Sequence, residues 1–323
     1  MGVMRQDSSN FQKLVGLYEN PILEYWQDKY TDTVRDSMIK ELFDVVQSDN
    51  PTEAISEQVG GPEFKQWNGE FTYGQVLDGN TKVWTPMVWQ AGMAYDRFLL
   101  SNAKLIKMKS DNGKFATSAG RLREACASGI FMNAAAASWV QNGVTLNWTN
   151  TADNLPLASH VHTSANYSTV QDNLTHNELN EANLEIACQR MFDFKDEDGN
   201  DANLQPDTII VPTALRGAAL ELIGGEGKSD VADNNPNIYN GNMRVIVWKN
   251  YRKLSGATGQ PWVVMDSKAA KDSLKWINRL ESGDEYDLTS WKDLETQTWK
   301  IGSIMWFTAG AYSWHPFVFN TPV

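Results

Sequence analysis

The 323-residue sequence has little cysteine and no long apolar run. Its 2 cysteines, Cys126 and Cys188, both lie in apolar stretches with helical spacing. This setting predicts two reduced, buried thiols rather than a disulfide framework. No stretch of about 18 apolar residues occurs, so the sequence predicts no transmembrane helix. Residues 1–12 lack the apolar core of a secretory signal, which predicts an unexported protein that folds in the cytoplasm.

Positive charge is also scarce. The chain has 28 Lys and Arg against 40 Asp and Glu, a net charge of -12. Affinity for nucleic acid comes largely from cationic side chains on phosphates, so we expect any nearby DNA to be enclosed rather than tightly bound. With 41% hydrophobic residues the chain can still bury a substantial core. Its 13 tryptophans exceed what that core needs and favour extensive contacts between subunits.

Recognisable catalytic motifs are missing as well. The sequence has no Gly-x-Ser-x-Gly elbow and no Gly-x-Gly-x-x-Gly dinucleotide fingerprint, and neither cysteine stands in a catalytic context. Residues 224–229 imitate the end of a phosphate-binding loop, but Leu222 stands where the first Gly belongs. The segment also follows a predicted helix rather than a strand. A surface loop is therefore the expected structure.

One acidic segment is similar to a calcium loop. Asp196, Asp198 and Asn200 have the spacing of the first calcium ligands. Asp201, however, replaces the Gly needed for the sharp turn, and Asp207 stands where the bidentate Glu belongs. A solvated turn before a strand is the favoured interpretation.

His160 and His162 are the most plausible metal ligands. They could offer two imidazoles if they alternated on a strand, with His176 or an acidic residue completing the set. Only the spacing supports this, because the neighbouring Ser, Thr and Asn predict a loop. A hydrogen-bonded or exposed pair is favoured, and a metal-dependent hydrolase using His160 and His162 stays open as an alternative.

The first half of the chain predicts an arm, a hairpin and a long helix. Residues 11–46 favour helical pieces interrupted at Pro21, followed by a Gly-rich connection. Two β-leaning runs then flank Asp78-Gly79-Asn80, which predicts a β-hairpin with its turn at these residues. Residues 111–140 carry one apolar stripe in steps of three and four, which predicts a single long helix.

The second half predicts a compact α/β domain. Asn180 has the residue type and position of the N-cap of an amphipathic helix. Strands are expected at residues 207–211, 243–248, 262–265 and 301–308, and a helix is expected at residues 214–223. Strands interleaved with helices are typical of a domain that has its own core.

This order of elements resembles the Hong Kong 97-type major capsid fold of tailed bacteriophages. The most specific likeness is in residues 179–215, where a helix leads through an Asp-Gly turn into a Pro-Asp strand ending in Val-Pro, as in Mu-like and related phage head proteins. Trp67-Asn-Gly-Glu70 resembles the start of their extended loop. Asn133-Ala-Ala-Ala-Ala137 resembles the end of their spine helix. The segment Ser159-His160-Val161-His162 departs from the commoner His-Pro of the family, which leaves that loop's conformation open.

The resemblance implies an α+β fold with five parts. These are an N-terminal arm at 1–65, an extended β-hairpin loop at 66–100, a peripheral domain at 101–204 with a spine helix at about 111–140, an axial α/β domain at 205–310 and a C-terminal segment at 311–323. The assembly-interface candidates are Trp67, Phe71, Tyr73, Asp78, Gly79, Trp84 and Trp89.

The resemblance also implies a structural protein without catalytic residues, metal or cofactor. A major capsid subunit of this type assembles into pentamers and hexamers, and these form an icosahedral head around double-stranded DNA without sequence-specific binding. The implied location is the virion, assembled in the host bacterial cytoplasm, and the implied partners are portal, scaffolding and decoration proteins, with no membrane. Because no long charged coiled-coil segment precedes the arm, we expect a separate scaffolding protein. An encapsulin-like nanocompartment shell is the alternative of the same fold.

Overall fold

The chain folds into helices and sheets, so the predicted α+β class is confirmed. The computed structural model describes residues 7–61, 64–71, 73–102, 105–164, 166–224, 239–280 and 284–322. The helices are α1 Asp7–Val34, α2 Ile39–Leu42, α3 Arg97–Ser101, α4 Leu105–Met132, α5 Glu181–Phe192, η1 Thr213–Leu215 (a 3-10 turn), α6 Arg216–Gly224 and α7 Ser267–Ser273. The strands are β1 Asp44–Gln47, β2 Glu53–Gly60, β3 Val76–Trp84, β4 Met87–Asp96, β5 Trp139–Gln141, β6 Val144–Leu146, β7 Leu174–Thr175, β8 Thr208–Val211, β9 Arg244–Val247, β10 Trp262–Met265, β11 Leu274–Asn278, β12 Asp287–Asp293, β13 Thr298–Ala311 and β14 Phe317–Asn320.

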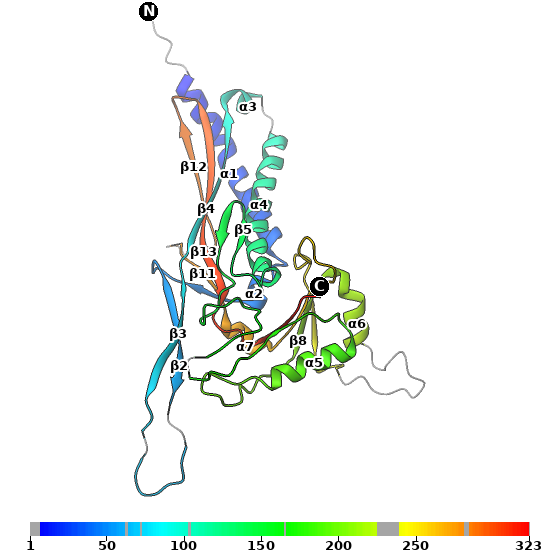
Figure 1. The fold of residues 1–323 in the computed structure, drawn as a ribbon. Coiled ribbons are helices and arrows are strands. Elements are labelled where there is room, and N and C mark those ends of the chain that lie inside the picture. The colour runs from blue at the N-terminus through cyan, green and yellow to red at the C-terminus, as the bar shows by residue number, and fades with distance from the viewer. Residues whose placement is uncertain are drawn as a thin grey trace, which may run out of the picture.

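A five-stranded sheet of β1, β11, β13, β12 and β4 forms the elongated part of the molecule (Figure 1). Its central strand, β13, pairs antiparallel with β4 from Thr298↔Asp96 to Phe307↔Met87. The other edge of β13 is shared by β12 and β11, which pair with successive parts of it. β1 pairs in parallel with β11 at the end of the sheet. The strand expected at residues 301–308 is therefore part of a longer one.

Helices α1 and α4 lie side by side along this sheet (Figure 1). α1 continues through Pro21 without a break, so the expected interruption there is wrong. The helix buries Phe11 and Val15 before the proline, and Ile22 and Trp26 after it. A proline inside a helix costs about 3 kcal/mol. Burial of each large apolar side chain stabilises the fold by about 1.5–3 kcal/mol, so packing on both sides of Pro21 outweighs the local cost.

The predicted spine helix exists, but its bounds differ from the expected 111–140. It begins and ends several residues earlier, as Leu105–Met132. Just after its end the Asn133 side chain donates to the carbonyl of Gly129 at 2.8 Å. The carbonyl of Ala136 accepts a hydrogen bond from a threonine hydroxyl of a later loop at 2.6 Å. These bonds take the place of the next helical turn, and the alanine run does not indicate where the helix ends.

A second five-stranded sheet, in the order β7-β14-β10-β8-β9, forms the lobe that α5 and α6 accompany (Figure 1). The strands expected at 207–211, 243–248 and 262–265 are confirmed as β8, β9 and β10. The predicted cap is also confirmed, because the Asn180 side chain accepts a hydrogen bond from the backbone N–H of Asn183 at 2.9 Å.

The hairpin is present but not where the sequence predicted it. β3 pairs antiparallel with β2, from Glu53↔Trp84 to Gly60↔Val76, and contains Asp78-Gly79-Asn80. These residues therefore do not form the turn. The register shifts between the pairs Ser56↔Thr81 and Gln58↔Asp78, so that two residues of β3, Gly79 and Asn80, face Glu57 in a β-bulge. An Asp-Gly-Asn sequence fits either a turn or a bulge, so the local signal could not separate the two.

The expected grouping of residues 205–310 into one α/β unit also differs from the sheet topology. Strands β11, β12 and β13 belong to the long sheet beside α4, whereas β8, β9 and β10 belong to the second sheet. Residues 1–65 do not form a separate arm either, because α1 packs along α4 and β2 belongs to the hairpin. The roles of these parts in a shell stay predictions.

The aromatic and sulfur-containing residues lie mostly in the core. Ten tryptophans are at most 9% exposed, so most of the tryptophan excess serves packing within the chain rather than contacts between subunits. One cluster stacks Trp276 on Phe307 with ring centroids 4.9 Å apart. Cys126 and Cys188 are free and buried, as predicted. Burial raises the pKa of each thiol to about 12.

Candidate assembly interface

The loop that joins β2 to β3 carries exposed aromatic side chains. Phe64, Trp67, Phe71 and Tyr73 have exposed fractions of 108%, 65%, 75% and 87%. The rings of Trp67 and Phe71 contact each other edge to face, with centroids 5.2 Å apart. Figure 1 shows this loop at the far end of the projecting hairpin. A cluster of large apolar rings held away from the body is typical of a surface that another molecule covers.

The structure divides the predicted interface candidates among three locations. In the exposed loop lie Trp67, Phe71 and Tyr73; on β3 lie Asp78 and Gly79; in the interior lie Trp84 and Trp89. Trp84 is 2% exposed, and Trp89 is 8% exposed and stacks on Phe307. Both tryptophans are therefore core residues of this chain. Phe64 was missed because its polar, Gly-rich neighbourhood was interpreted only as a flexible connection.

Polar contacts hold the paired strands β2 and β3, the base from which the loop projects, against the body. The backbone N–H of Gly60 donates to both carboxylate oxygens of Asp198 at 2.9 Å. The ammonium group of Lys82 donates to the backbone carbonyl of Asn150. Burial lowers the pKa of Lys82 to about 8. These bonds fix where the hairpin leaves the body, while its loop stays uncovered.

The carboxyl group of Glu57 is buried at the same base. Burial raises its pKa to about 7, and the nearby carboxylates of Glu197 and Asp153 add to the rise. The backbone N–H of Asn80 opposes the rise by donating to Glu57 at 3.3 Å. Burial also raises the pKa of the nearby Tyr312, and the carboxylates of Glu57 and Glu197 add to that rise. The contact between hairpin and body therefore depends on protonation.

The long sheet has a second exposed apolar area. A depression of about 420 Å³ lies where Gly92 and Gly302 are paired across β4 and β13. Trp291 and Ile304 line it and are 48% and 38% exposed. A Cβ atom on Gly302 would lie 3.1 Å from the Trp291 ring, so the glycine leaves space for the indole. This face is a further candidate for contact between subunits.

His160 and His162 do not share a metal site. The Nδ1 of His160 lies 3.1 Å from Asp172, and its ring contacts that of His176. His162 is fully buried, and its Nδ1 lies 2.7 Å from Asp153. Burial alone would raise the pKa of Asp153, but hydrogen bonds from His162 and Thr151 lower it overall. Across the described ranges, no group of three His, Cys, Asp or Glu side chains could hold a metal ion.

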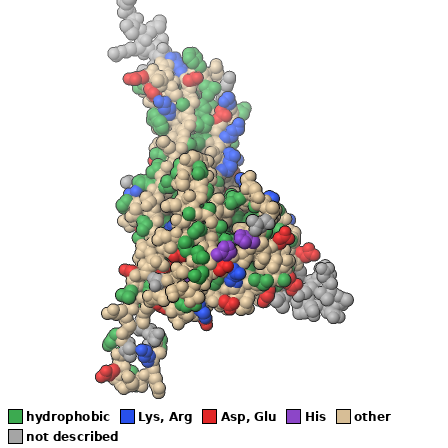
Figure 2. Space-filling model, viewed as in Figure 1, with side chains coloured by type: hydrophobic (Ala, Val, Ile, Leu, Met, Phe, Trp, Pro, Cys, Tyr) green, Lys and Arg blue, Asp and Glu red, His purple; other side chains and the backbone are tan. Residues whose placement is uncertain are grey.

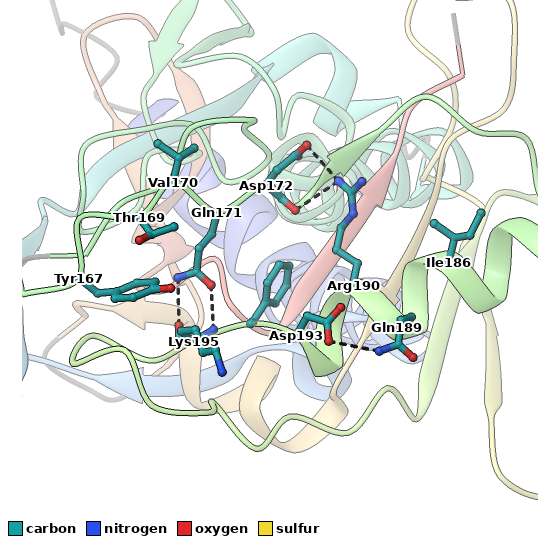
Figure 3. Close-up of a pocket in the computed structure, with 11 residues that line it drawn as sticks. Tyr167, Thr169, Val170, Gln171, Asp172, Ile186, Gln189, Arg190, Asp193 and Lys195 are labelled. Carbon is teal, nitrogen blue, oxygen red and sulfur yellow. Dashed lines mark hydrogen bonds and ion pairs between the residues drawn. The ribbon is translucent and has the colours of Figure 1, made fainter.

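The pocket in Figure 3, of about 530 Å³, lies beside α5 and shows no catalytic arrangement. Arg190 pairs with Asp172 at 3.1 Å. The side-chain amide of Gln171 exchanges two hydrogen bonds with the backbone of Lys195, at 3.1 and 2.8 Å. Asp193 accepts a hydrogen bond from Gln189. Most of the polar side chains among the described lining residues therefore bond to one another or to the backbone.

The remaining motifs have structural roles or fall outside the described residues. Asp196 accepts hydrogen bonds from the backbone N–H groups of Asp198 and Asn200, at 3.0 and 2.8 Å, so the acidic segment forms the expected turn. Residues 225–229 of the phosphate-loop-like segment lie outside the described residues. No helix among the described residues is both long and apolar enough to cross a bilayer.

Comparison with known proteins identifies the fold. Residues 160–251 match the family model described as Mu-like prophage major head subunit gpT. This match covers a minority of the chain and includes the whole of residues 179–215, the segment that carried the resemblance in sequence. No curated protein matches the chain.

Solved capsid structures match most of the chain at low identity. The mature capsid of bacteriophage PhiM1 matches with a TM-score of 0.54 and 13% identity, covering 89% of this chain and 87% of that one. The capsid of Ralstonia phage GP4 matches with a TM-score of 0.56 and 11% identity, covering 89% and 91%. A virus-like particle from Pyrococcus furiosus matches with a TM-score of 0.50 and 11% identity, covering 92% and 98%. The chain therefore has the Hong Kong 97-type capsid fold.

Proposed function

We propose that this chain is the major capsid subunit of a tailed bacteriophage and forms its icosahedral head. The observation that carries the proposal is the capsid fold over most of the chain. The partial match to a phage major head subunit supports it. The subunit is a structural component of the virion, and its fold, rather than a reactive site, performs its function.

In this proposal the hairpin performs the main assembly step. Each loop of Phe64, Trp67, Phe71 and Tyr73 lies across an adjoining subunit and buries its aromatic rings there. Such contacts are heterologous, because one surface of a subunit meets a different surface of the next, and they close when the rotation completes a ring or shell. Many modest contacts then sum into a stable particle.

The two lobes take different places in the shell. We assign the long sheet with α1 and α4 to the peripheral domain, and the second sheet with α5 and α6 to the axial domain around the symmetry axes of pentamers and hexamers. The partners expected from this function are portal, scaffolding and decoration proteins. Double-stranded DNA is enclosed without sequence-specific contacts, in keeping with the net charge of -12.

Negative-stain electron microscopy with analytical ultracentrifugation of the recombinant protein tests the proposal, alone and with a candidate scaffolding protein. We expect closed shells, tubes or discrete capsomers. A strictly monomeric, compact species under every condition would contradict the assembly function.

A nanocompartment shell is the second candidate, because the virus-like particle from Pyrococcus furiosus matches over almost all of its own chain. The contents of native particles separate the two candidates. A packaged double-stranded DNA genome supports the phage head, whereas a protein cargo at fixed stoichiometry without DNA supports the nanocompartment.

A further inference from the structure

A groove between α1 and α4 gathers basic side chains on an otherwise acidic chain. The groove encloses about 490 Å³ and contains Lys29 from α1 and Lys109, Lys114 and Arg121 from α4. None of the described residues that line it is acidic, although the whole chain carries a net charge of -12. Figure 2 shows Lys and Arg side chains along the right-hand edge of the upper part, where Figure 1 places α4. The local charge is thus opposite in sign to that of the molecule.

Close helix packing forms the floor of this groove. A Cβ atom on Gly113 would lie 3.2 Å from the Tyr25 ring, so the glycine lets that ring lie close to α4. The ammonium groups of Lys29 and Lys109 each lie 5.8 Å from the centre of the Tyr25 ring. An aromatic face attracts cations at this distance and holds both at the floor.

Lys29 pairs with Asp32 at 3.4 Å, but the other three cations have no partner of opposite charge among the described residues. Among the described residues no carboxylate lies within ion-pair distance of Lys109, Lys114 or Arg121. Lys107, two residues before Lys109 on the same helix, pairs with Asp111 at 2.7 Å. Lys109, Lys114 and Arg121 therefore present positive charge that the described part of the chain leaves unneutralised, and this charge attracts an anionic partner.

The groove also offers apolar surface. Ile106 lines it and is 89% exposed, and the Tyr25 ring forms its floor. From Lys109 to Arg121 the basic residues extend over about 18 Å of α4, which matches about three turns of a partner helix. A partner that covers both kinds of surface needs acidic and apolar side chains at helical spacing.

We propose that this groove binds an acidic amphipathic helix from an assembly protein. The apolar stripe of that helix would cover Ile106 and Tyr25, and its acidic flanks would pair with Lys109, Lys114 and Arg121. DNA is the less suitable occupant, because phosphates would use the cations but leave Ile106 in water, and the acidic remainder of the chain repels a duplex. The inference rests on the proposed shell function for the identity of the partner.

Fluorescence anisotropy of labelled probes on the soluble full-length chain tests this inference. The probes are a helical peptide of Leu and Glu about 27 Å long, a polyglutamate of equal charge, and a short DNA duplex. We expect the Leu-Glu peptide to bind most tightly and to weaken with added salt. The double variant Lys109→Glu, Lys114→Glu should weaken its binding at least about tenfold, a loss of about 1.4 kcal/mol.

A matched charge reversal provides the control. Lys268 and Lys271 are exposed on α7, outside the groove, and the variant Lys268→Glu, Lys271→Glu changes the net charge by the same amount. This variant should bind the Leu-Glu peptide with a Kd within about twofold of the wild-type value. An equal loss in both variants, no binding of the Leu-Glu peptide to the wild-type chain, or tighter binding of duplex or polyglutamate than of the Leu-Glu peptide would overturn the inference. Shell formation is scored separately by microscopy, so shells without peptide binding sink this inference and leave the proposed function intact.

Discussion

Arg123 is a cation buried in the core between α4 and the long sheet. It is 2% exposed, its guanidinium group lies 5.2 Å from the centre of the Trp276 ring, and it lies 3.5 Å from the Glu285 carboxylate. Tyr30 donates to the same carboxylate at 2.9 Å. Removal of Arg123 deprives the half-buried Glu285 carboxylate of its buried partner and leaves a gap in the core beside Trp276.

We therefore predict that Arg123→Met lowers the free energy of unfolding by about 3 kcal/mol. Lys40 provides the control, because it lies 3.8 Å from the same carboxylate but its side chain is 74% exposed. Lys40→Met should cost at most about 0.5 kcal/mol. Urea unfolding of the soluble subunit measures both values, and equal losses would contradict the assigned role of Arg123.

Glu57 makes the stability of the hairpin base depend on pH. Because burial raises its folded-state pKa to about 7, the folded state holds the proton more tightly than the unfolded state does. The contribution of Glu57 to stability is therefore fully present below the ordinary glutamate pKa of about 4.3 and is lost as the pH rises through about 7. Glu197 at the same base also has a raised pKa, caused first by burial, and contributes with the same sign.

The neutral substitution Glu57→Gln should raise the thermal midpoint above pH 7, with a gain that shrinks toward pH 5. Glu53 on the same strand is the control of opposite sign, because hydrogen bonds from Ser48 and Asn50 lower its pKa. Glu53→Gln should lower the midpoint at neutral pH. Thermal scans between pH 5 and 8 distinguish these outcomes, and a pH-independent effect of Glu57→Gln would exclude the assignment.

At the scale of elements, the closeness of α1 and α4 depends on a glycine. A Cβ atom on Gly120 would lie 2.7 Å from the Thr33 side chain of α1, whereas one on Gly16 would meet nothing within 4 Å. The same substitution should therefore have opposite effects at the two sites. Gly120→Ala should destabilise the subunit by about 1–3 kcal/mol through overpacking. Gly16→Ala should stabilise it by up to about 1 kcal/mol through helix propensity. Shifts of the unfolding midpoint in the same direction for both variants would refute this account.

Elements with strong local signals could be predicted from the sequence. The N-cap Asn180 and the short apolar strands β8 and β10 were found because their residues carry the information locally. The long helix was found from its stripe, but its end depends on hydrogen bonds between Asn133 and Gly129 and to a distant loop. Local patterns contain no record of such contacts.

The hairpin shows the limit most clearly. β2 is polar along most of its length, and it is a strand because it pairs with β3 and buries Glu57 and Val59 against the body. This pairing joins residues that lie far apart in the sequence, so the local pattern at Asp78-Gly79-Asn80 could not reveal it. Of the predicted interface candidates, Trp67, Phe71 and Tyr73 are exposed and their role stays a prediction, whereas the buried positions of Trp84 and Trp89 depend on the whole fold.

For the whole molecule, the aromatic loop should decide assembly without affecting folding. Deletion of residues 74–86 would not test this, because it removes β3 and the buried Trp84. Replacement of residues 61–75 by Asn-Gly instead joins the Gly60↔Val76 pair with a two-residue turn of the type that antiparallel strands favour. We predict a folded subunit with little change in its thermal midpoint and no closed shells.

The double variant Trp67→Ser, Phe71→Ser tests the aromatic rings with the loop length kept. Its matched control is Phe98→Ser, because Phe98 is 76% exposed on α3 and lies outside the hairpin. If the hairpin loop buries its rings against a neighbouring subunit, the double variant loses shells in electron microscopy while Phe98→Ser keeps them. Each ring buried between subunits contributes about 1.5–3 kcal/mol, and this loss is repeated at every contact of the shell, so a modest defect in one pair prevents closure. Normal particles from the double variant would show that the exposed rings are not the assembly contact. The apolar face around Trp291 and Ile304 would then be the remaining candidate for that contact.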